Sequence, residues 1–538
     1  MPQAGHTTDV EGVIARFAQL LAEDRKDEAL SEITEVLRAL VTHSSHLEHR
    51  LLKLLRERYG RKSERIDAAQ LALFVAEALV TSTTAGGGEP PDAATAPAPE
   101  AELPRPEPKP REGHGRRPLP PELPREEVVL EPPAESRVCA TCGIDKTCIG
   151  HETSEVLEYV PAHFKVIVTR RAKYACRTCE DGVVIAERSA DRPIDGGLPG
   201  PGLLAQVLVG KYQDQLPLNR LSKIFARFGV NLSRSTLMGW VAAGAADLEP
   251  IAARIRELVL VAHVLLTDDT GIRVLDRDHP KGSRRGHLWV YVGDTQWCAY
   301  AYTPDWRSEG PRSFLAKRRG WVVHDGYAGY DALFEGEDAT ALDVACWSHA
   351  RRGLVDALEG GDVRAAIGIA HMRKLFDLER QATEDGVDAD ERLRRRRAHA
   401  PAVLAALGTW MAETYNAEPP TSPLAKAIAY IVKRWQALSR FLEDGRVPLT
   451  NNLSERRLRP IAVGRHNWLF AGSDAGAERA ATIYTVLGTC AMSGVEPWAY
   501  LRDVLVKLQA GWPQSRLDEL LPPNWKLAHP EAAVPAHT

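Results

Sequence analysis

The sequence predicts a multidomain protein in which an N-terminal α-helical coiled coil, a zinc ribbon and a further helical segment precede an α/β core with a helical insertion. Three observations predict this fold class. The 538 residues exceed the roughly 250–300 that one hydrophobic core usually serves. A stretch rich in Pro, Gly and Ala, followed by two Cys-x-x-Cys pairs, divides the chain. Beyond it, short runs rich in β-branched residues alternate with helical patterns, which is typical of an α/β domain.

The composition is nearly balanced in charge and poor in cysteine. Lys and Arg number 68 against 72 Asp and Glu, so no overall basic field indicates a nucleic-acid partner. Eight cysteines are too few for a secreted disulfide scaffold, and the N-terminus lacks the basic and apolar regions of a signal peptide. The longest apolar stretch, near Leu258–Leu266, is shorter than the ~20 residues of a membrane helix. We therefore expect a cytoplasmic protein without a membrane partner.

Residues 10–80 are expected to be helical and leucine-zipper-like. Apolar side chains recur at heptad a and d positions, which fits a parallel self-associating coiled coil and a monomeric two-helix hairpin equally well. The basic stretch that follows is a candidate for contact with DNA phosphates through Arg61, Lys62 and Arg65. The heptad positions are occupied by Leu30, Ile33, Leu37, Leu40, Leu47, Leu51 and Leu54.

Residues 81–125 are a predicted linker. They are dense in Pro, Gly, Ala and Glu and nearly free of large apolar side chains. Such a segment has too little apolar area to offset chain entropy, so we expect it to be extended and mobile.

Residues 126–190 are expected to form a zinc ribbon. Two Cys-x-x-Cys turns present four thiolates, which complete a closed tetrahedral Zn²⁺ site, and residues 156–168 alternate enough to supply short strands. The alternative is a set of four reduced structural cysteines, and Cys148 and His151 are candidate substitutes for one ligand. The predicted ligands are Cys139, Cys142, Cys176 and Cys179.

Residues 200–250 have a helix-turn-helix-like pattern. A helix is expected from Pro217 to about Phe228, Gly229 interrupts it, and Ser233 or Ser235 can cap a second helix over 236–246. The same pattern fits ordinary helical packing as well as it fits a DNA-binding motif.

Residues 255–350 and 446–490 are expected to form one mixed α/β core, with residues 351–445 as a helical insertion and 491–530 as a short C-terminal region. The order of three strands, helix, strand, helix and strand matches a ribonuclease-H-like sheet, in which the first and fourth strands are neighbours. The expected strands are Val261–Leu275, His287–Asp294, Trp297–Thr303, Trp321–Asp325 and Ala341–Trp347, with a helix around Arg312–Arg318.

Three acidic positions of this core are candidate metal ligands. Asp268 and Asp325 each end an apolar, β-branched run, and Glu455 lies in a polar segment compatible with a helix. If the fold brings these carboxylates together, they form a set of hard oxygen ligands that suits Mg²⁺ or Mn²⁺. Two such ions can activate an attacking hydroxyl and stabilise the departing oxygen at a phosphodiester. Asp269 competes with Asp268, because neighbouring side chains point to opposite faces of a strand and only one can join.

Several motifs give the chain a specific resemblance. It resembles the large transposase of the IS-sixty-six type of bacterial insertion sequences, whose catalytic core belongs to the DDE superfamily. The resemblance runs nearly end to end. The motifs are Tyr59-Gly60-Arg61-Lys62-Ser63-Glu64-Arg65, Leu119-Pro120-Pro121-Glu122-Leu123-Pro124-Arg125, Lys211-Tyr212, Leu216-Pro217-Leu218-Asn219-Arg220, Asp325-Gly326-Tyr327-Ala328-Gly329-Tyr330, Cys346-Trp347-Ser348-His349-Ala350-Arg351-Arg352, Asn451-Asn452-Leu453-Ser454-Glu455-Arg456 and Gly464-Arg465-His466-Asn467-Trp468-Leu469-Phe470-Ala471-Gly472-Ser473.

The resemblance implies a DNA transposase that cleaves transposon ends and joins them to target DNA. It places the three catalytic acids on Asp268, Asp325 and Glu455, and it favours Asp268 over Asp269, which stands where the family usually has glutamate. A second departure is His466, within a segment that usually reads Arg-Lys-Asn. The implied partners are transposon-end and target DNA, a second copy of the chain in a synaptic complex, and small accessory proteins encoded by the same element.

Further residues near these motifs are candidates for contact with DNA or for shaping the site. Cys346 and His349 are expected at the active-site floor or against the flanking DNA, with a purely structural pair as the alternative. Asn451 and Asn452 fit contacts to Glu455 or to a phosphate and fit a helix N-cap equally well. The candidate DNA contacts here are His349, Arg351, Arg352, Asn451, Asn452, Arg456, Arg457, Arg459 and Arg465.

Two other functions fit parts of the sequence. A non-catalytic zinc-ribbon regulator that binds DNA would have a decayed core, and the intact surroundings of the three acids argue against it. A ribonuclease-H-like nuclease or resolvase that cuts without joining shares the same acids, so a strand-transfer assay is needed to distinguish it from a transposase.

Overall fold

The computed structural model describes residues 197–336 and 339–534, together with parts of 16–34 and the short stretches 68–84, 164–168, 173–174, 184–185 and 193–194. The chain divides into two compact units, of which the larger comprises Met1–Gly88 and Arg170–Thr538. The smaller unit, Glu89–Thr169, is described only at residues 164–168, which are not in a strand. The four predicted zinc ligands and the candidates Arg61, Lys62 and Arg65 lie outside the described residues.

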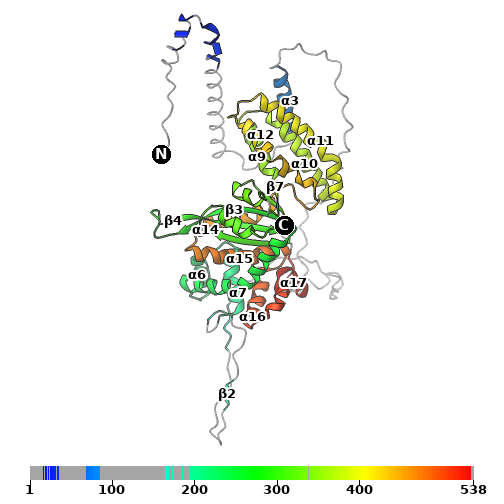
Figure 1. Cartoon of the computed structure of the whole chain (residues 1–538). Coiled ribbons are helices and arrows are strands. Elements are labelled where there is room, and N and C mark those ends of the chain that lie inside the picture. The colour runs from blue at the N-terminus through cyan, green and yellow to red at the C-terminus, as the bar shows by residue number, and fades with distance from the viewer. Residues whose placement is uncertain are drawn as a thin grey trace, which may run out of the picture. The chain divides into compact units, whose positions relative to one another are not determined.

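A five-stranded mixed sheet lies at the centre of the larger unit (Figure 1). The strand order is β5-β4-β3-β6-β7; β3 pairs antiparallel with β4 and parallel with β6. The predicted adjacency of the first and fourth strands of the core is therefore confirmed. The strands are β3 (Val264–Leu275), β4 (Ser283–Gly293), β5 (Trp297–Thr303), β6 (Gly320–His324) and β7 (Ala341–Ala345).

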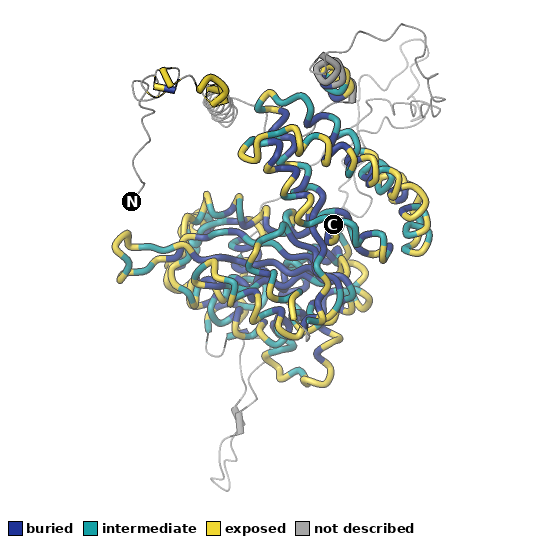
Figure 2. The backbone as a smooth tube through the Cα atoms, turned by 45° about the horizontal axis from the view of Figure 1, so that its top comes forward, coloured by how far each residue is buried: buried dark blue, intermediate teal, exposed yellow. Residues whose placement is uncertain are grey.

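The strand limits differ from the prediction mainly at one end of the sheet. β4 begins four residues earlier than expected, so β3 and β4 form a long hairpin whose far end is largely exposed (Figure 2). Exposed residues carry no apolar alternation, which explains why the sequence pattern did not reveal this extension. The predicted helix near residue 312 is α8 (Glu309–Leu315), and β6 connects to β7 through a short 3-10 helix, η1 (Ala328–Leu333).

Helices pack on the sheet, and further helices follow at the C-terminus of the chain. α7 and α15 pack together and against β5, while α14 crosses β3. These helices are α5 (Pro201–Tyr212), α6 (Leu218–Arg227), α7 (Arg234–Val261), α14 (Asn452–Trp468), α15 (Asp474–Ser493), α16 (Pro497–Gln509) and α17 (Pro522–Ala528), with η3 (Gln514–Leu520) and η4 (Pro530–Ala532). Among the described residues, no helix is both long and apolar enough to cross a membrane.

The second helix of the helix-turn-helix-like segment is much longer than predicted. Ser233, one of the two expected caps, caps α7: its hydroxyl oxygen accepts a hydrogen bond from the backbone N–H of Thr236 at 3.0 Å. The helix does not end near residue 246 but continues through Pro250 to Val261. Ten of its residues are buried, so tertiary packing outweighs the helix-breaking effect of the proline. α7 is therefore a scaffold helix for the sheet.

Residues between β7 and α14 form the helical insertion that the sequence predicted. Within it α10 packs against α9 and α11, and α9 packs against α12 (Figure 1). An N-terminal helix, α3 (Ala68–Thr84), also contacts α10. The insertion comprises α9 (Trp347–Glu359), α10 (Ala365–Glu384), α11 (Ala389–Asn416), α12 (Pro423–Lys433), α13 (Trp435–Ser439) and η2 (Arg440–Leu442). Two short strands, β1 (Lys173–Tyr174) and β2 (Val184–Ile185), pair antiparallel before α5.

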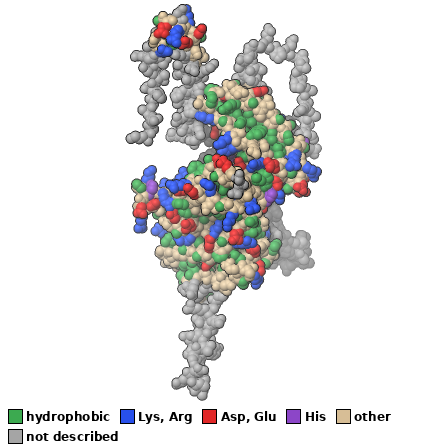
Figure 3. All heavy atoms as spheres, viewed as in Figure 1, with side chains coloured by type: hydrophobic (Ala, Val, Ile, Leu, Met, Phe, Trp, Pro, Cys, Tyr) green, Lys and Arg blue, Asp and Glu red, His purple; other side chains and the backbone are tan. Residues whose placement is uncertain are grey.

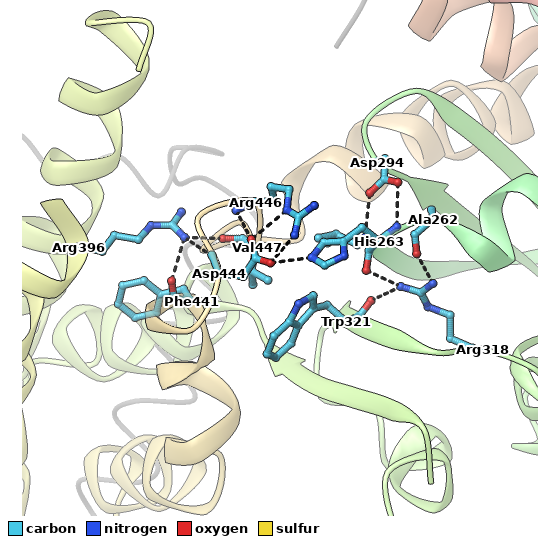
Figure 4. A network of polar contacts seen from close by, with 11 residues as sticks. Ala262, His263, Asp294, Arg318, Trp321, Arg396, Phe441, Asp444, Arg446 and Val447 are labelled. Carbon is cyan, nitrogen blue, oxygen red and sulfur yellow. Dashed lines mark hydrogen bonds and ion pairs between the residues drawn. The ribbon is translucent and has the colours of Figure 1, made fainter. Parts of the chain in front are cut away.

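A buried polar network joins the helical insertion to the sheet (Figure 4). Arg396 is 1% exposed, and its guanidinium donates to both carboxylate oxygens of Glu379 and to three backbone carbonyls, those of Phe441, Asp444 and Val447. The Asp444 carboxylate in turn lies 2.7 Å from Nε2 of His263, immediately before β3. The basic run at 394–397, which reads as a solvated helix face in the sequence, is thus partly internal.

Candidate active site

The first two predicted acids lie at the same edge of the sheet. β3 and β6 run parallel with Leu266 opposite Val323, and each acid lies two residues beyond its strand's member of that pair. Asp268 therefore lies within β3 just past its parallel pairing with β6, and Asp325 lies just past the last residue of β6, at the same level of the sheet. This edge is where parallel α/β sheets commonly form their sites.

The third acid reaches this edge because α14 is fixed to β3. Asn451 is fully buried, and its Nδ2 donates to the carbonyl of Thr267 at 2.8 Å, one residue before Asp268. Its backbone N–H donates to the Sγ of Cys346 at 3.2 Å. Glu455 lies in the first turn of the helix that follows. Glu455 is therefore near enough to Asp268 for its charge to affect that carboxyl.

The charges of these acids influence one another. Burial raises the pKa of Asp268 to about 7, and the nearby negative charges of Asp325, Glu455 and Asp269 also raise it. The backbone N–H of Asp269, which donates to Asp268 Oδ1 at 2.8 Å, opposes this effect. A bound cation strongly stabilises the ionised form of a buried carboxyl whose neighbours are also acidic.

Glu455 has an incompletely satisfied carboxylate. Its Oε1 is buried and accepts no hydrogen bond from the residues that the structure describes, although Nε2 of His349 lies 3.6 Å away. Hard oxygen donors with excess negative charge fit Mg²⁺ or Mn²⁺. Nowhere in the described ranges, however, are three His, Cys, Asp or Glu side chains close enough as they stand to hold an ion. The donor chemistry fits a divalent cation, whereas a closed cage is not preformed.

Asp269 has other partners, which favours Asp268 in a choice that strand periodicity left open. Its Oδ2 lies 2.5 Å from Nδ1 of His287, and its Oδ1 accepts from Nε1 of Trp306 at 3.1 Å. The Trp306 ring also stacks on His287 and on Tyr327. Asp269 therefore holds an aromatic cluster in place.

The helical insertion holds the turn that carries Asp325, a role that sequence analysis missed. The Tyr430 hydroxyl donates to the carbonyl of Asp325 at 2.7 Å, and Arg434 Nη2 donates to the carbonyl of Gly326. Gly326 has φ +90°, and a Cβ there would lie 2.4 Å from Nε of Arg434. The glycine after the acid hinted at such a turn. Its partners are more than 100 residues away, and no sequence signal links them.

The remaining candidates divide into exposed and internal residues. Arg456, Arg459 and Asn452 are exposed on α14. Two candidates make contacts within the protein: Asn451 is buried, and Arg465 Nη1 donates to Thr270 Oγ1 and to the carbonyl of Gly271, which clamps α14 to β3. Cys346 is buried, and Nε2 of His349 lies 3.6 Å from Oε1 of Glu455. Arg351 and Arg457 are partly buried, and Arg352 is exposed.

Comparison with known families decides the identity of this core. A family model described as "Transposase IS66 family" matches residues 196–479, which contain the sheet, the helical insertion and α14. This chain belongs to the IS66 transposase family. Three further matches lie outside this core: "zinc-finger binding domain of transposase IS66" at 136–180, "Transposase C of IS166 homeodomain" at 46–128 and "IS66 C-terminal element" at 485–522.

Relatives align with this IS66 chain over most of its length. One, named uncharacterized protein y4hP of Sinorhizobium fredii (strain NBRC 101917 / NGR234), is 35% identical over 90% of this chain and 89% of that protein. A second from the same strain, uncharacterized protein y4qI, is 34% identical over 98% of this chain and 99% of that protein. The multidomain IS66 layout, with a helical N-terminal region, a zinc-finger domain and a DDE-type transposase domain, is therefore established for this chain.

Proposed function

We propose that this protein is a DDE-type DNA transposase with a ribonuclease-H-like catalytic core, whose Asp268, Asp325 and Glu455 bind Mg²⁺ or Mn²⁺. The strongest support is that these acids come from β3, the end of β6 and the first turn of α14, yet influence one another electrostatically. The sheet order and the parallel pairing of β3 with β6 support the fold assignment.

In this proposal Asp268, Asp325 and Glu455 would hold the cations, which would supply activation of the attacking hydroxyl and stabilisation of the departing oxygen at the phosphodiester. His349, 3.6 Å from Glu455, orients that carboxylate, and Asn451 fixes the helix that carries it. Water attacks the phosphodiester at the transposon end and releases a 3′-hydroxyl, which then attacks target DNA in a second in-line transfer. No covalent protein–DNA intermediate is required, so no nucleophilic side chain is assigned.

DNA binding is proposed for several parts of the chain. Arg456 and Arg459, one and four residues beyond Glu455 on α14, are exposed, form no ion pair with any described residue, and are suited to phosphates beside the scissile bond. The four paired cysteines, within the zinc-finger match, are proposed to hold a structural Zn²⁺ and to contribute to recognition of the transposon end. We also infer that two chains act together in a synaptic complex, with accessory proteins as further partners.

Strand cleavage tests the assignment. Purified protein is incubated with DNA bearing the ends of its own element and Mg²⁺, and the cleaved strand is mapped. Replacing Asp268, Asp325 or Glu455 with Ala should abolish cleavage and leave end binding largely intact, whereas replacing the exposed acid Glu309 with Ala should change neither. Full cleavage by all three variants would refute the proposal. A strand-transfer assay with pre-cut ends then separates a transposase from a nuclease that cuts without joining.

A further inference from the structure

The turn after α14 exposes two large apolar side chains in a strained conformation. Leu469 has φ +61° and ψ −39°, in the left-handed region that favours glycine. Its side chain is 61% exposed, and that of Phe470 is 42% exposed. Both belong to a motif of the sequence to which the proposed chemistry assigns no role. A buried contact does not explain the strain, because both side chains extend into solvent.

This turn is held on both sides. The backbone N–H of Leu469 donates to the carbonyl of Arg465, and the N–H of Phe470 donates to the carbonyl of Trp468. These two hydrogen bonds close the end of α14. On the other side, Ala471 pairs with the far part of β3: its N–H donates to the carbonyl of Arg273, and its carbonyl accepts from Leu275. The exposed pair therefore forms a fixed projection from the sheet.

The surroundings of the projection are apolar at its centre and cationic around it. Leu275, 41% exposed, lies beside it on β3. Arg273 and its cross-strand neighbour Arg285 form no ion pair with any described residue. Two acids of this region, Asp276 and Asp474, are both paired with Arg284. In Figure 3, Lys and Arg side chains are visible on this hairpin, at the left of the view, among some acidic ones.

We propose that Leu469 and Phe470 form a wedge that inserts between base pairs of DNA bound along α14. This inference rests on the proposed function. Apolar wedges flanked by cationic side chains unstack base steps while the cations hold the adjacent phosphates. A protein partner is less compatible, because covering the apolar pair would also desolvate the two unpaired arginines. At about 1.5 Å rise per residue, the wedge lies about 20 Å along α14 from Glu455. That is the length of about six base pairs.

Binding to paired and distorted DNA tests the wedge. The full-length protein, without added Mg²⁺ or Mn²⁺ so that it does not cleave, is titrated with a duplex of the element's terminal sequence and with the same duplex carrying adjacent mismatches six base pairs from the cleavage site. A 2-aminopurine at that step reports unstacking. The wild type should bind the mismatched duplex about tenfold more tightly than the paired one, because its bases are already unstacked. It should also raise the fluorescence of the paired probe.

Two variants and one control make the result specific. Phe470→Ala and Leu469→Gly should lose most of the preference for the mismatched duplex and the fluorescence rise. The glycine accepts a positive φ without strain, so Leu469→Gly should be at least as stable as the wild type, which excludes misfolding as the cause. Leu527→Ala, which removes an 83% exposed leucine from α17, should behave as wild type.

The outcomes separate this proposal from the proposed function. If the wild type binds the terminal duplex and both variants keep its mismatch preference and fluorescence signal, the wedge is refuted and the transposase assignment stands. The wedge is also refuted if the variants instead change only the mass of the protein in solution, because the surface is then a protein contact. If the wild type binds neither duplex, the proposed function fails and the wedge with it.

Discussion

At the residue scale, the Asp268 carboxyl links the stability of the protein to pH and to cations. Its pKa in the folded state is about 7 against an ordinary value of 3.8, so the folded state binds the proton more tightly. The stability that this preference contributes is fully present below about pH 4 and is lost as the pH rises through 7. Above pH 7 the ionised, crowded carboxylate destabilises the cation-free fold.

Replacing Asp268 with Asn should therefore stabilise the protein in EDTA at pH 8. We expect the substitution to raise the free energy of unfolding by roughly 1–3 kcal/mol at pH 8, and this gain should disappear at pH 4. Mg²⁺ should raise the melting temperature of the wild type at pH 8 and have little effect on Asp268→Asn. Thermal denaturation at the two pH values measures both effects. Parallel pH profiles for the two proteins would contradict this account.

Individual site residues were predictable where a backbone pattern marks them. In the sequence Asp268 and Asp325 end apolar, β-branched runs, and both lie just past the parallel pairing of β3 with β6, although β3 itself continues to Leu275. The sequence could not distinguish Asn451 as a buried bridge from Asn451 as a cap. That distinction depends on the carbonyl of Thr267, 184 residues away. For the same reason the sequence could not reveal that Arg465 clamps α14 to β3, because an arginine clamp and an arginine bound to phosphate look alike in a sequence.

At the element scale, the contact between α12 and the Asp325 turn predicts a selective effect on cleavage. Gly326→Ala forces a Cβ toward Arg434 and should displace Asp325, reducing cleavage more than tenfold, because small misplacements of catalytic groups are costly. Gly361 also has a positive φ, +99°, but open space around it, so Gly361→Ala is the matched control. Both variants should lose about 1–2 kcal/mol of stability. Equal cleavage rates in the two variants would exclude this positioning role.

The buried arginine of α11 predicts a second effect, on stability alone. Arg396→Ala removes five hydrogen bonds and leaves the Glu379 carboxylate less well paired, which should cost about 3–5 kcal/mol. Arg394, 77% exposed and paired with Glu391, is the control, and Arg394→Ala should change stability by less than about 0.5 kcal/mol. Urea denaturation measures both. Similar losses in the two variants would show that burial of Arg396 is not what matters.

Element types were more predictable than element ends. The strands of the core were located from β-branched runs, whereas the start of β4 and the end of α7 were not. The first lies in an exposed hairpin without apolar alternation. The second follows Pro250, where local propensity favours a stop and the burial of Ile251, Ile255 and Val259 overrides it.

At the scale of the whole molecule, the N-terminal heptads predict self-association. Leu30 is 65% exposed and Ile33 is 38% exposed, although both occupy heptad core positions, so they are available to a second chain. The double substitution Leu30→Glu with Ile33→Glu should lower the mass of the protein in light scattering. Leu73→Glu, at a 71% exposed position of α3, should leave the mass unchanged. An unchanged mass in the double variant would favour the monomeric hairpin.

The tie between the helical insertion and the Asp325 turn has a consequence for damaged copies of the gene. An in-frame deletion that removes α10–α12 spares all five strands of the sheet and α14, but it removes Tyr430, which holds the backbone at Asp325. If the proposed function is right, such a remnant should still occupy transposon ends without cutting them. Genomes that accumulate these remnants should then restrain the movement of the intact element, because inert copies compete for the same DNA.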